Sequence, residues 1–484
     1  MGVNALLDVL YKEADIHTPL QEHQLRVVER MKQPDQPGLV VAHGLGSGKT
    51  LTSIAAQDAL GLPSVILVPA SLKGNYDKER QKHIDGTSPE AAIMSMQRVA
   101  LMGHVPNAPM LIIDEAHRAR EVDSKTYKAL KRNLAEKRML LTASPFYNRP
   151  SDIAPLVNVA AGYGALPADP QAFKEKYIRE RTISPGFFQR LQGMEAGVVE
   201  ELDPKRAKEL KQVFRRWVDF HPSSQKGYPK VEREVVTVPM TDHQLKIYDS
   251  IIGKAPPWVA MKVKAGLPPS KQESQQLNAF ATAVRQISNS TRAYAPEAHP
   301  EEPKIEAAFQ NLRKELEGNP RSKAIVYSNY LESGVAPYRE RLQGSNIEFG
   351  EYTGQMKKKD RDQLVRDFNS GKKRVILLSS AGGEGLDLKG TRLVQILEPH
   401  WNAEKLKQVE GRAIRYLSHE HLPEEEQKVR VESYLSTRPR AGILEKLRIS
   451  KPGGGIDEYL TTLSLQKEQL VGQFRHLLPG AEAS

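Results

Sequence analysis

The chain has 484 residues, a formal net charge of +11, 39% hydrophobic residues and no cysteine. This length exceeds one small module and predicts about two to four domains. Without cysteine there is no disulfide, thiolate metal site or cysteine nucleophile, which fits a reducing intracellular compartment. The sequence has no signal-peptide pattern and no membrane-length apolar run, so we expect no membrane contact. The excess positive charge favours a polyanionic partner such as nucleic acid.

Short, nearly continuous apolar runs recur along the chain, as is typical of strands buried on both faces of a parallel sheet. In the first part of the chain they cover residues 39–44, 64–70, 110–117 and 139–144. Helical stretches such as 50–59 lie between them, so strand and helix alternate. The same pattern returns at residues 323–329, 349–354, 374–380, 392–399 and 429–436. The sequence therefore predicts an α/β protein with two parallel sheets.

The stretch between these two regions, residues 165–310, is highly charged and is predicted to be helical. Proline-rich segments at 254–270 and 294–303 interrupt it and indicate loops or linkers. From Ile456 onward, apolar residues recur at steps of three or four, which predicts an amphipathic helix. We expect this last helix to pack on the second sheet.

The segment HGLGSGKT, residues 43–50, follows directly after a predicted strand. Gly46 and Gly48 permit a tight turn whose backbone N–H groups face a phosphate, and the following helix adds its positive end. Lys49 would reach the β- and γ-phosphates of a nucleotide, and Thr50 would hold Mg²⁺. His43 stands where the general pattern has glycine. The alternative is a glycine-rich surface turn without a ligand.

Two acidic residues, Asp114 and Glu115, end the predicted strand at 110–117. The carboxyl ends of strands in such a sheet are where ligands bind. Asp114 would hold Mg²⁺ through its waters, and Glu115 would orient or deprotonate the attacking water. A solvated strand end is the alternative, but the phosphate loop earlier in the chain favours a catalytic pair.

A third signal is QVEGRAIR, residues 408–415. Arg412 and Arg415 are three residues apart, so we expect them to share one face of a helix. Arginines from a second domain can neutralise charge that develops on the γ-phosphate. The alternative is an ordinary charged helix face.

With these three elements in order, the chain resembles superfamily 2 helicases, and more narrowly the Swi/Snf-like double-stranded DNA translocases. The resemblance covers about residues 18–436 and rests on several stretches: LQEHQ (20–24), VILVPASLKGNYDKE (65–79), DEAHRAR (114–120), LTASPFYNRP (141–150) and LLSSAGGEGLDL (377–388). The loop HGLGSGKT, Ile414 and Tyr76 depart from the pattern of chromatin remodellers. The loop HGLGSGKT and the ending GIDEYLTTLSLQKEQLVGQF resemble more closely the compact helicase-like ATPases of large DNA viruses and phages.

The resemblance implies two RecA-like lobes with parallel sheets, ATP between them, helical protrusions and a C-terminal helix. The implied domains are residues 1–164 as the first, ATP-binding lobe, 165–310 as the protrusions and linker, 311–440 as the second lobe with the arginine fingers, and 441–484 as a C-terminal helical brace.

The resemblance also implies roles for residues beyond those derived above. Those that would bind the nucleotide are Gln24, at the adenine, with Gly46, Ser47, Gly48, Lys49, Thr50, Gly385 and Asp387. Those that would couple nucleotide state to lobe movement are His117, Thr142, Ser144 and Gln408. Those that would contact nucleic acid, or else be ordinary loop residues, are Ser71, Lys73, Ser328, Ser379 and Ser380.

The implied function is an ATP-dependent translocase that tracks double-stranded DNA largely independently of sequence and displaces or remodels protein–DNA or branched DNA complexes. ATP and Mg²⁺ are the expected cofactors, other DNA-bound proteins are expected partners, and we expect a monomer. The expected location is the cytoplasm or nucleus, including that of a virus-infected host cell. Two alternatives stay open: a strand-separating helicase, and a nonhydrolysing nucleic-acid clamp or transcription-associated scaffold.

Overall fold

The structure is a computed structural model that describes residues 18–84, 89–184, 196–223, 227–294, 299–352, 356–379, 386–399, 403–415, 417–439 and 455–481. The chain divides into two compact units. The first comprises Met1–Arg179, Glu200–Gln225 and Gln469–Ser484, and the second comprises Glu180–Val199 and Lys226–Glu468.

The first unit is built on a six-stranded sheet with the order β3-β2-β4-β5-β1-β8, in which all pairs are parallel. Its strands are β1 (Gly38–His43), β2 (Ser64–Val68), β3 (Ala91–Ser95), β4 (Met110–Ile113), β5 (Lys137–Thr142) and β8 (Val218–His221). Four of them were predicted from apolar runs. The short strands β3 and β8 were not: β3 (AAIMS) is short, partly exposed and begins with two alanines, and β8 (VDFH) is half polar.

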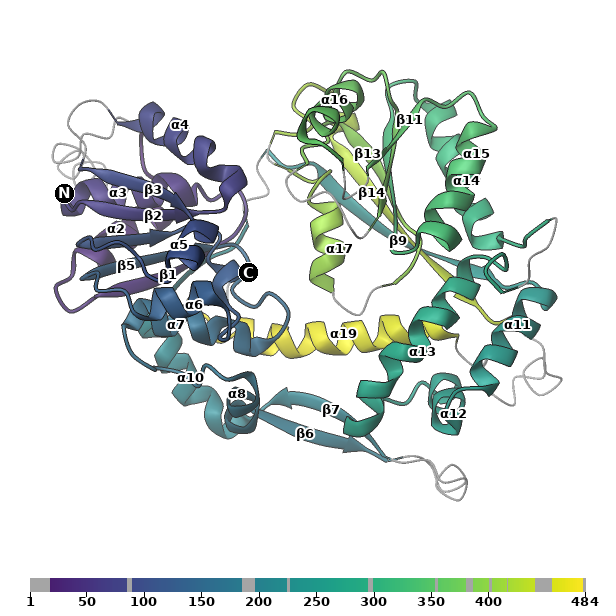
Figure 1. The fold of residues 1–484 in the computed structure, drawn as a ribbon, viewed down its shortest axis with the longest axis horizontal. Coiled ribbons are helices and arrows are strands. Elements are labelled where there is room, and N and C mark those ends of the chain that lie inside the picture. Colours follow the sequence, from purple (N-terminus) through teal and green to yellow (C-terminus); the bar gives the residue numbers. More distant parts are fainter. Residues whose placement is uncertain are drawn as a thin grey trace. The chain divides into compact units, whose positions relative to one another are not determined.

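Alternating strand residues of this sheet face two separate cores. Leu39 and Val41 point to one core, and Val40 and Ala42 point to the other. Figure 1 shows α2, α3 and α4 on one side of the sheet and α5, α6 and α7 on the other. The helices of this unit are α2 (Glu22–Lys32), α3 (Lys49–Leu60), α4 (Lys73–His83), α5 (Met96–Met102), α6 (Lys125–Lys131), α7 (Ile153–Ala161), α8 (Pro170–Tyr177) and α10 (Pro204–Trp217).

The second unit has its own six-stranded parallel sheet, with the order β11-β12-β10-β13-β14-β9. Its strands are β9 (Lys230–Pro239), β10 (Lys323–Ser328), β11 (Phe349–Tyr352), β12 (Val375–Ser379), β13 (Thr391–Ile396) and β14 (Lys428–Thr437). Helices α14 (Pro303–Gly318) and α15 (Ala336–Gln343) cover one face, and α16 (Lys358–Asn369) and α17 (Ala403–Glu410) cover the other (Figure 1). The predicted α/β class with two parallel sheets is confirmed, and the fold is that of two RecA-like lobes.

Residues 165–310 are not purely helical, contrary to the expectation from their charge. Strand β8 extends the first sheet beside β1, and β9 extends the second sheet beside β14. Strands β6 (Ile178–Ile183) and β7 (Gly197–Leu202) form a small sheet of their own. The prediction failed here because charged strands at a sheet edge lack the apolar runs of central strands.

The remaining helices of the second unit form a cluster away from its sheet. They are α11 (Asp242–Gly253), α12 (Pro257–Ala265) and α13 (Lys271–Asn289).

The predicted C-terminal helix is present as α19 (Ile456–Arg475), but it does not pack on the second sheet as expected. Its first turns join the cluster of α11–α13 through Ile456 and Leu460. Its last turns contribute Leu470 and Phe474 to the core of the first unit. The apolar spacing predicted the helix correctly. The surfaces on which it packs are set by the apolar side chains of distant segments, which the spacing does not reveal. Among the described residues, no helix has the length and apolar character needed to cross a membrane.

Candidate nucleotide-binding site

The segment between β1 and α3 has the conformation that the glycine pattern predicts. Gly46 and Gly48 both adopt left-handed backbone angles, with φ of 75° and 72°. A Cβ atom on Gly48 would also lie 2.5 Å from Nε2 of Gln24, so both its conformation and its surroundings favour glycine. Gly48 is the N-cap of α3, and the helix therefore begins at Lys49. The positive end of the helix and the loop N–H groups make this a fitting cradle for a phosphate.

Lys49 lies across this loop and near the acidic pair. Its Nζ donates to the carbonyl oxygen of Gly44 at 3.1 Å, and Ser47 Oγ donates to the same oxygen at 2.8 Å. Burial lowers the pKa of Lys49, whereas the nearby carboxylates of Glu115 and Asp114 act in the opposite direction. Lys49 of the phosphate loop therefore interacts electrostatically with the acidic pair Asp114 and Glu115 in the first unit.

The acidic pair follows β4, at the carboxyl edge of the sheet. Asp114 Oδ1 accepts a hydrogen bond from the backbone N–H of Glu115 at 2.9 Å. Burial, together with the charge of Glu115, raises the pKa of Asp114 to about 6. A divalent cation would relieve both effects, and oxygen donors of this kind suit Mg²⁺. The donor set of Asp114 and Thr50 therefore fits the expected metal.

Glu115 has a φ of 50°, which is unusual for a residue with a side chain. Backbone strain of this kind costs about 1–3 kcal/mol and is concentrated at functional sites. The conformation places Glu115 Oε2 3.3 Å from Nδ1 of His117. The strained residue is the one that the sequence predicted to act on water.

The predicted coupling residues His117, Thr142 and Ser144 lie next to one another. His117 Nδ1 is 3.2 Å from Oγ1 of Thr142, and the backbone N–H of Ser144 donates to the same Oγ1 at 3.0 Å. Thr142 is buried at the end of β5, where it pairs in register with Ala42 of β1. A continuous chain of contacts therefore runs from Glu115 to the segment after β5.

The sequence did not predict two neighbours of His117, the aromatic Tyr147 and the cationic Arg120. The ring of Tyr147 stacks on His117 with centroids 5.0 Å apart and an interplanar angle of 6°. The guanidinium of Arg120 lies 4.2 Å from the centroid of the Tyr147 ring. Both residues belong to motifs that the resemblance quoted, DEAHRAR and LTASPFYNRP, but no spacing rule links them.

Gln24, expected at the adenine, is buried against the phosphate loop. Its Nε2 donates to the carbonyl oxygens of Ser47 and Gly48, both at 3.2 Å, while its Oε1 accepts from the backbone N–H of Gln21 at 2.8 Å. In this structure its amide supports the loop. Tyr76, noted in the sequence as a departure from the remodellers, hydrogen-bonds Ser53 of α3 at 2.6 Å.

In the second unit, helix α17 ends at Glu410, so Arg412 and Arg415 do not share a helix face as the spacing predicted. Turns follow instead, with the N–H of Arg412 donating to Val409 at 3.2 Å. Gly411 is a poor helix former at this point. Arg412 is buried, and Arg415 Nε donates to the carbonyl oxygen of Gly411 at 3.0 Å.

The second unit also contains other residues that were predicted to bind nucleotide or to couple its state to lobe movement. Gln408 lies on α17, and Asp387 lies shortly before β13. Gly385 and Ser380 lie outside the described residues.

The described residues that were predicted to contact nucleic acid lie at strand ends in the second unit and near the start of α4 in the first. Ser328 and Ser379 end β10 and β12, where they are partners in register, and both are buried. Ser328 Oγ donates to Oε1 of Glu398 at 2.5 Å. The carboxylate of Glu398 is buried, and the sequence analysis did not predict a role for it. Lys73 begins α4 and is exposed, and Ser71 lies in the short helix Ala70–Leu72.

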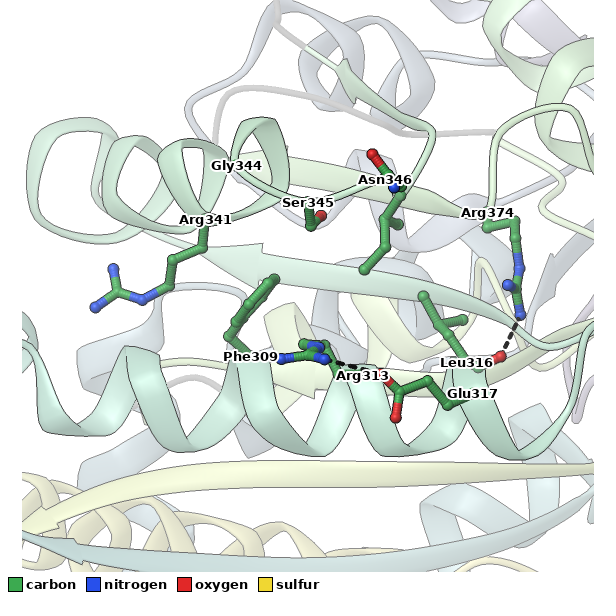
Figure 2. A pocket seen from close by; sticks show the side chains of 10 residues that line it. Phe309, Arg313, Leu316, Glu317, Arg341, Gly344, Ser345, Asn346 and Arg374 are labelled. Atoms are coloured by element: carbon green, nitrogen blue, oxygen red, sulfur yellow. Dashed lines mark hydrogen bonds and ion pairs between the residues drawn. The ribbon is translucent and has the colours of Figure 1, made fainter.

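A hollow of about 510 Å³ lies in the second unit, beside α14 and α15, and none of the predicted site residues lines it. Figure 2 shows its arginines, Arg313, Arg341 and Arg374. Arg313 pairs with Glu317 at 3.0 Å, and Arg374 donates to the carbonyl oxygen of Leu316 at 3.0 Å. These guanidinium groups stabilise the surrounding helices, and the hollow is not the candidate nucleotide site.

Two RecA-like units, one with a phosphate loop and an acidic pair at the carboxyl edge of its sheet, define a helicase-like ATPase. Residues 92–293 match the model of the SNF2-related domain, and residues 307–417 match that of the helicase conserved C-terminal domain. A protein of Acanthamoeba polyphaga mimivirus named as an ATP-dependent RNA helicase is 30% identical over 479 residues, covering 95% of this chain and 96% of its own. The chain belongs to this family of superfamily 2, SNF2-related helicases, and it is an ATP hydrolase.

Two further proteins are similar to this chain. The termination factor NPH-I homolog of African swine fever virus is 26% identical and covers 92% of this chain and 76% of its own. The solved SWI2/SNF2 ATPase core of Sulfolobus solfataricus in complex with dsDNA has 17% identity and a TM-score of 0.36, covering 96% of this chain and 98% of its own.

Proposed function

We propose that the protein is an ATP-driven translocase that tracks double-stranded DNA and displaces or remodels the complexes it meets there. The observation that carries the proposal is the match to the SNF2-related domain over residues 92–293, a region that includes the acidic pair. The net charge of +11 supports a polyanionic track.

The chemistry we propose is hydrolysis of the γ-phosphate. The loop N–H groups and Lys49 bind the phosphates, and Glu115 orients water or takes its proton. Thr50 and Asp114 would hold Mg²⁺, which when bound offsets phosphate charge and polarises the phosphoryl group. Arg412 and Arg415 would stabilise the transition-state charge, as arginine fingers do.

Coupling to movement would start at the contacts of Glu115. Hydrolysis of the bound nucleotide would change the groups next to the Glu115 carboxylate, which contacts His117. The hydrogen bond between His117 and Thr142 would then transmit this change to the segment after β5. Lobe movements of this kind can commit the substrate and limit turnover.

We propose that the track is formed by contacts to phosphates, which carry no sequence information and make binding sensitive to salt. In this proposal the exposed basic residues of α10 extend the track. These residues are Lys205, Arg206, Lys208 and Arg215. We expect a monomer whose further partners are proteins already bound to the DNA.

A strand-separating helicase acting on RNA or DNA is the second candidate. The observation in its favour is that the mimivirus relative is named as an ATP-dependent RNA helicase. The African swine fever virus relative is named a termination factor, and this name favours a role during transcription. A nonhydrolysing clamp is disfavoured because Lys49, Asp114 and Glu115 are all present.

The decisive experiment measures ATP turnover with duplex DNA, single-stranded DNA and RNA side by side, at low salt with Mg²⁺. We expect duplex DNA to stimulate turnover most, and Lys49→Ala to abolish turnover with every nucleic acid. No stimulation by duplex DNA would overturn the translocase. Stimulation by RNA alone would support the second candidate.

A second assay separates tracking from unwinding. Displacement of the third strand of a triplex, without unwinding of a tailed duplex, is the result expected of a translocase. Efficient unwinding of the tailed duplex would support the helicase instead.

A further inference from the structure

Asp219 is a buried carboxylate in β8, the edge strand beside β1. It is only 2% exposed, yet it accepts hydrogen bonds from three side chains. His43 Nε2 lies 2.8 Å from its Oδ1, Arg26 donates from Nη2 to Oδ1 at 2.8 Å and from Nε to Oδ2 at 3.0 Å, and Arg30 donates to Oδ2 at 3.3 Å. Buried carboxylates require partners of this kind, and here the partners come from two other segments of the chain.

One of those partners, His43, is the first residue of the phosphate-loop motif and stands where glycine is usual. It is fully buried, and its Nδ1 has no hydrogen-bond partner among the described residues. Burial lowers the pKa of His43, whereas Asp219 acts against that shift. Asp219 is therefore the hydrogen-bond partner of a ring that otherwise packs against His23 and His221.

The same strand and the residues after it contact the phosphate loop directly. The N–H of Gly44 donates to the carbonyl oxygen of His221 at 2.8 Å, and the N–H of Leu45 donates to Ser223 Oγ at 3.1 Å. A Cβ atom on Gly44 would lie 2.3 Å from the backbone nitrogen of Ser223, so the two segments are in close contact.

A stacked pair of histidines completes the support. The rings of His23 and His221 are parallel, with centroids 3.8 Å apart, and His23 Nε2 lies 2.8 Å from the carbonyl oxygen of Ser47. Within the described ranges, no group of three or more histidine and acidic side chains is arranged to hold a metal ion. The cluster is a set of contacts around the loop.

We propose that Asp219 is a positioning residue for the phosphate loop, which holds His43 and the start of the loop in the conformation that binds ATP. The proposal rests on the proposed role of this loop in binding nucleotide. Asp219 itself does not touch the nucleotide in this proposal. Its effect is therefore on nucleotide affinity, while the chemical step, which depends on Glu115, is retained.

Burial of Asp219 by itself would raise the pKa of its carboxyl group, but the hydrogen bonds from His43 and Arg26 hold that pKa well below its usual range. The carboxylate is thus charged, and replacing it with a neutral amide weakens its hold on both partners.

The test compares Asp219→Asn with the wild type in the full chain. Affinity for a fluorescent ATP analogue is measured by titration, and steady-state ATP hydrolysis supplies KM and kcat. We expect Kd and KM to rise about tenfold, with kcat changed less than about twofold, because outer-shell contacts set the geometry of a site.

Asp457→Asn is the matched control. Asp457 is also a buried carboxylate, and its Oδ2 accepts from Lys304 Nζ and from the backbone N–H of Ser436, both at 2.9 Å, in the second unit. This change should lower stability without changing Kd or KM. Arg26→Gln is a second variant at a half-exposed side chain, and we expect Kd to rise about threefold.

The outcomes separate the two proposals. If the wild type binds the analogue and Lys49→Ala abolishes binding, while Asp219→Asn and Arg26→Gln bind like the wild type, the positioning role is overturned. An equal loss of affinity in Asp457→Asn would also overturn it, because the effect would then be general destabilisation. If the wild type binds no nucleotide, the proposed function fails instead.

Discussion

Glu115 combines a strained backbone with a direct contact to His117. Its φ of 50° would be inexpensive for glycine or asparagine, yet the chain keeps a glutamate there. The carboxylate lies 3.3 Å from Nδ1 of His117, beside a neighbouring carboxyl group whose pKa is raised to about 6 by burial. At the scale of single residues, strain and charge are concentrated where hydrolysis is proposed.

Glu115→Gln is expected to reduce kcat for ATP hydrolysis by about 100-fold or more, because the amide cannot take a proton from water. Affinity for ATP should be retained. Turnover and nucleotide titration measure the two effects separately.

Glu121→Gln is its control, since Glu121 is a half-exposed glutamate in the same region. It should turn over ATP like the wild type. Unchanged turnover in Glu115→Gln would contradict the assignment of Glu115.

The histidines behind the loop predict a pH effect on stability. Burial, with the nearby His23 and His43, lowers the pKa of His221 from 6.5 to about 4. Between these values the unfolded chain binds more protons than the folded one, so this contribution to stability is present above about pH 6.5 and is lost as the pH falls towards 4. His221→Gln should therefore flatten the fall in unfolding free energy over this range, as measured by urea denaturation at several pH values.

His104→Gln removes an exposed imidazole and serves as the comparison. It should keep the pH profile of the wild type. A profile for His221→Gln that is as steep as that of the wild type would contradict the prediction.

At the scale of elements, α19 shows how one helix contributes to two cores. Phe474 is fully buried in the core of the first unit, with its ring centroid 5.9 Å from that of Phe173. Leu465, on the same helix, is 54% exposed. The helix therefore offers a buried and an exposed apolar residue for direct comparison.

Phe474→Ala is expected to lower the free energy of unfolding by about 3–5 kcal/mol, because a large cavity replaces the ring. Leu465→Ala should change it by no more than about 0.5 kcal/mol. Chemical denaturation of the full chain measures both. Equal effects of the two substitutions would show that the last turns of α19 do not stabilise the first unit.

At the scale of the whole molecule, the proposed function requires the two units to act on one nucleotide. Arg412 belongs to the second unit, whereas the phosphate loop belongs to the first. Arginine fingers contribute about 10³- to 10⁵-fold to turnover where they operate.

Arg412→Ala should therefore reduce ATP turnover by at least about 10³-fold, with a smaller change in nucleotide affinity. Arg313→Ala, a half-exposed arginine of the same unit paired with Glu317, is the control and should behave like the wild type. Steady-state hydrolysis in the presence of duplex DNA is the measurement. Full turnover by Arg412→Ala would contradict the finger assignment.

Much of the fold could be predicted because its signals are local. The strands within the runs at 39–44 and 323–329 are buried on both faces, and short apolar runs of this kind indicate strands of a parallel sheet. The turn at Gly46 and Gly48 depends on the missing side chains of those two residues, and it appears where expected. The edge strand β8 gave no such signal, because its sequence VDFH is half polar.

The amino-acid sequence by itself determined the alternating α/β pattern, the phosphate loop, the acidic pair and the family, since each of these is encoded by residues that are close together in the chain. Only the tertiary structure decided that Asp219 meets His43, 176 positions away, that the helix before Arg412 ends at Glu410, and which cores α19 joins. The physical reason is that a buried charge or an apolar helix face is stabilised by whichever distant segment is folded against it, and adjacent residues carry no record of that choice.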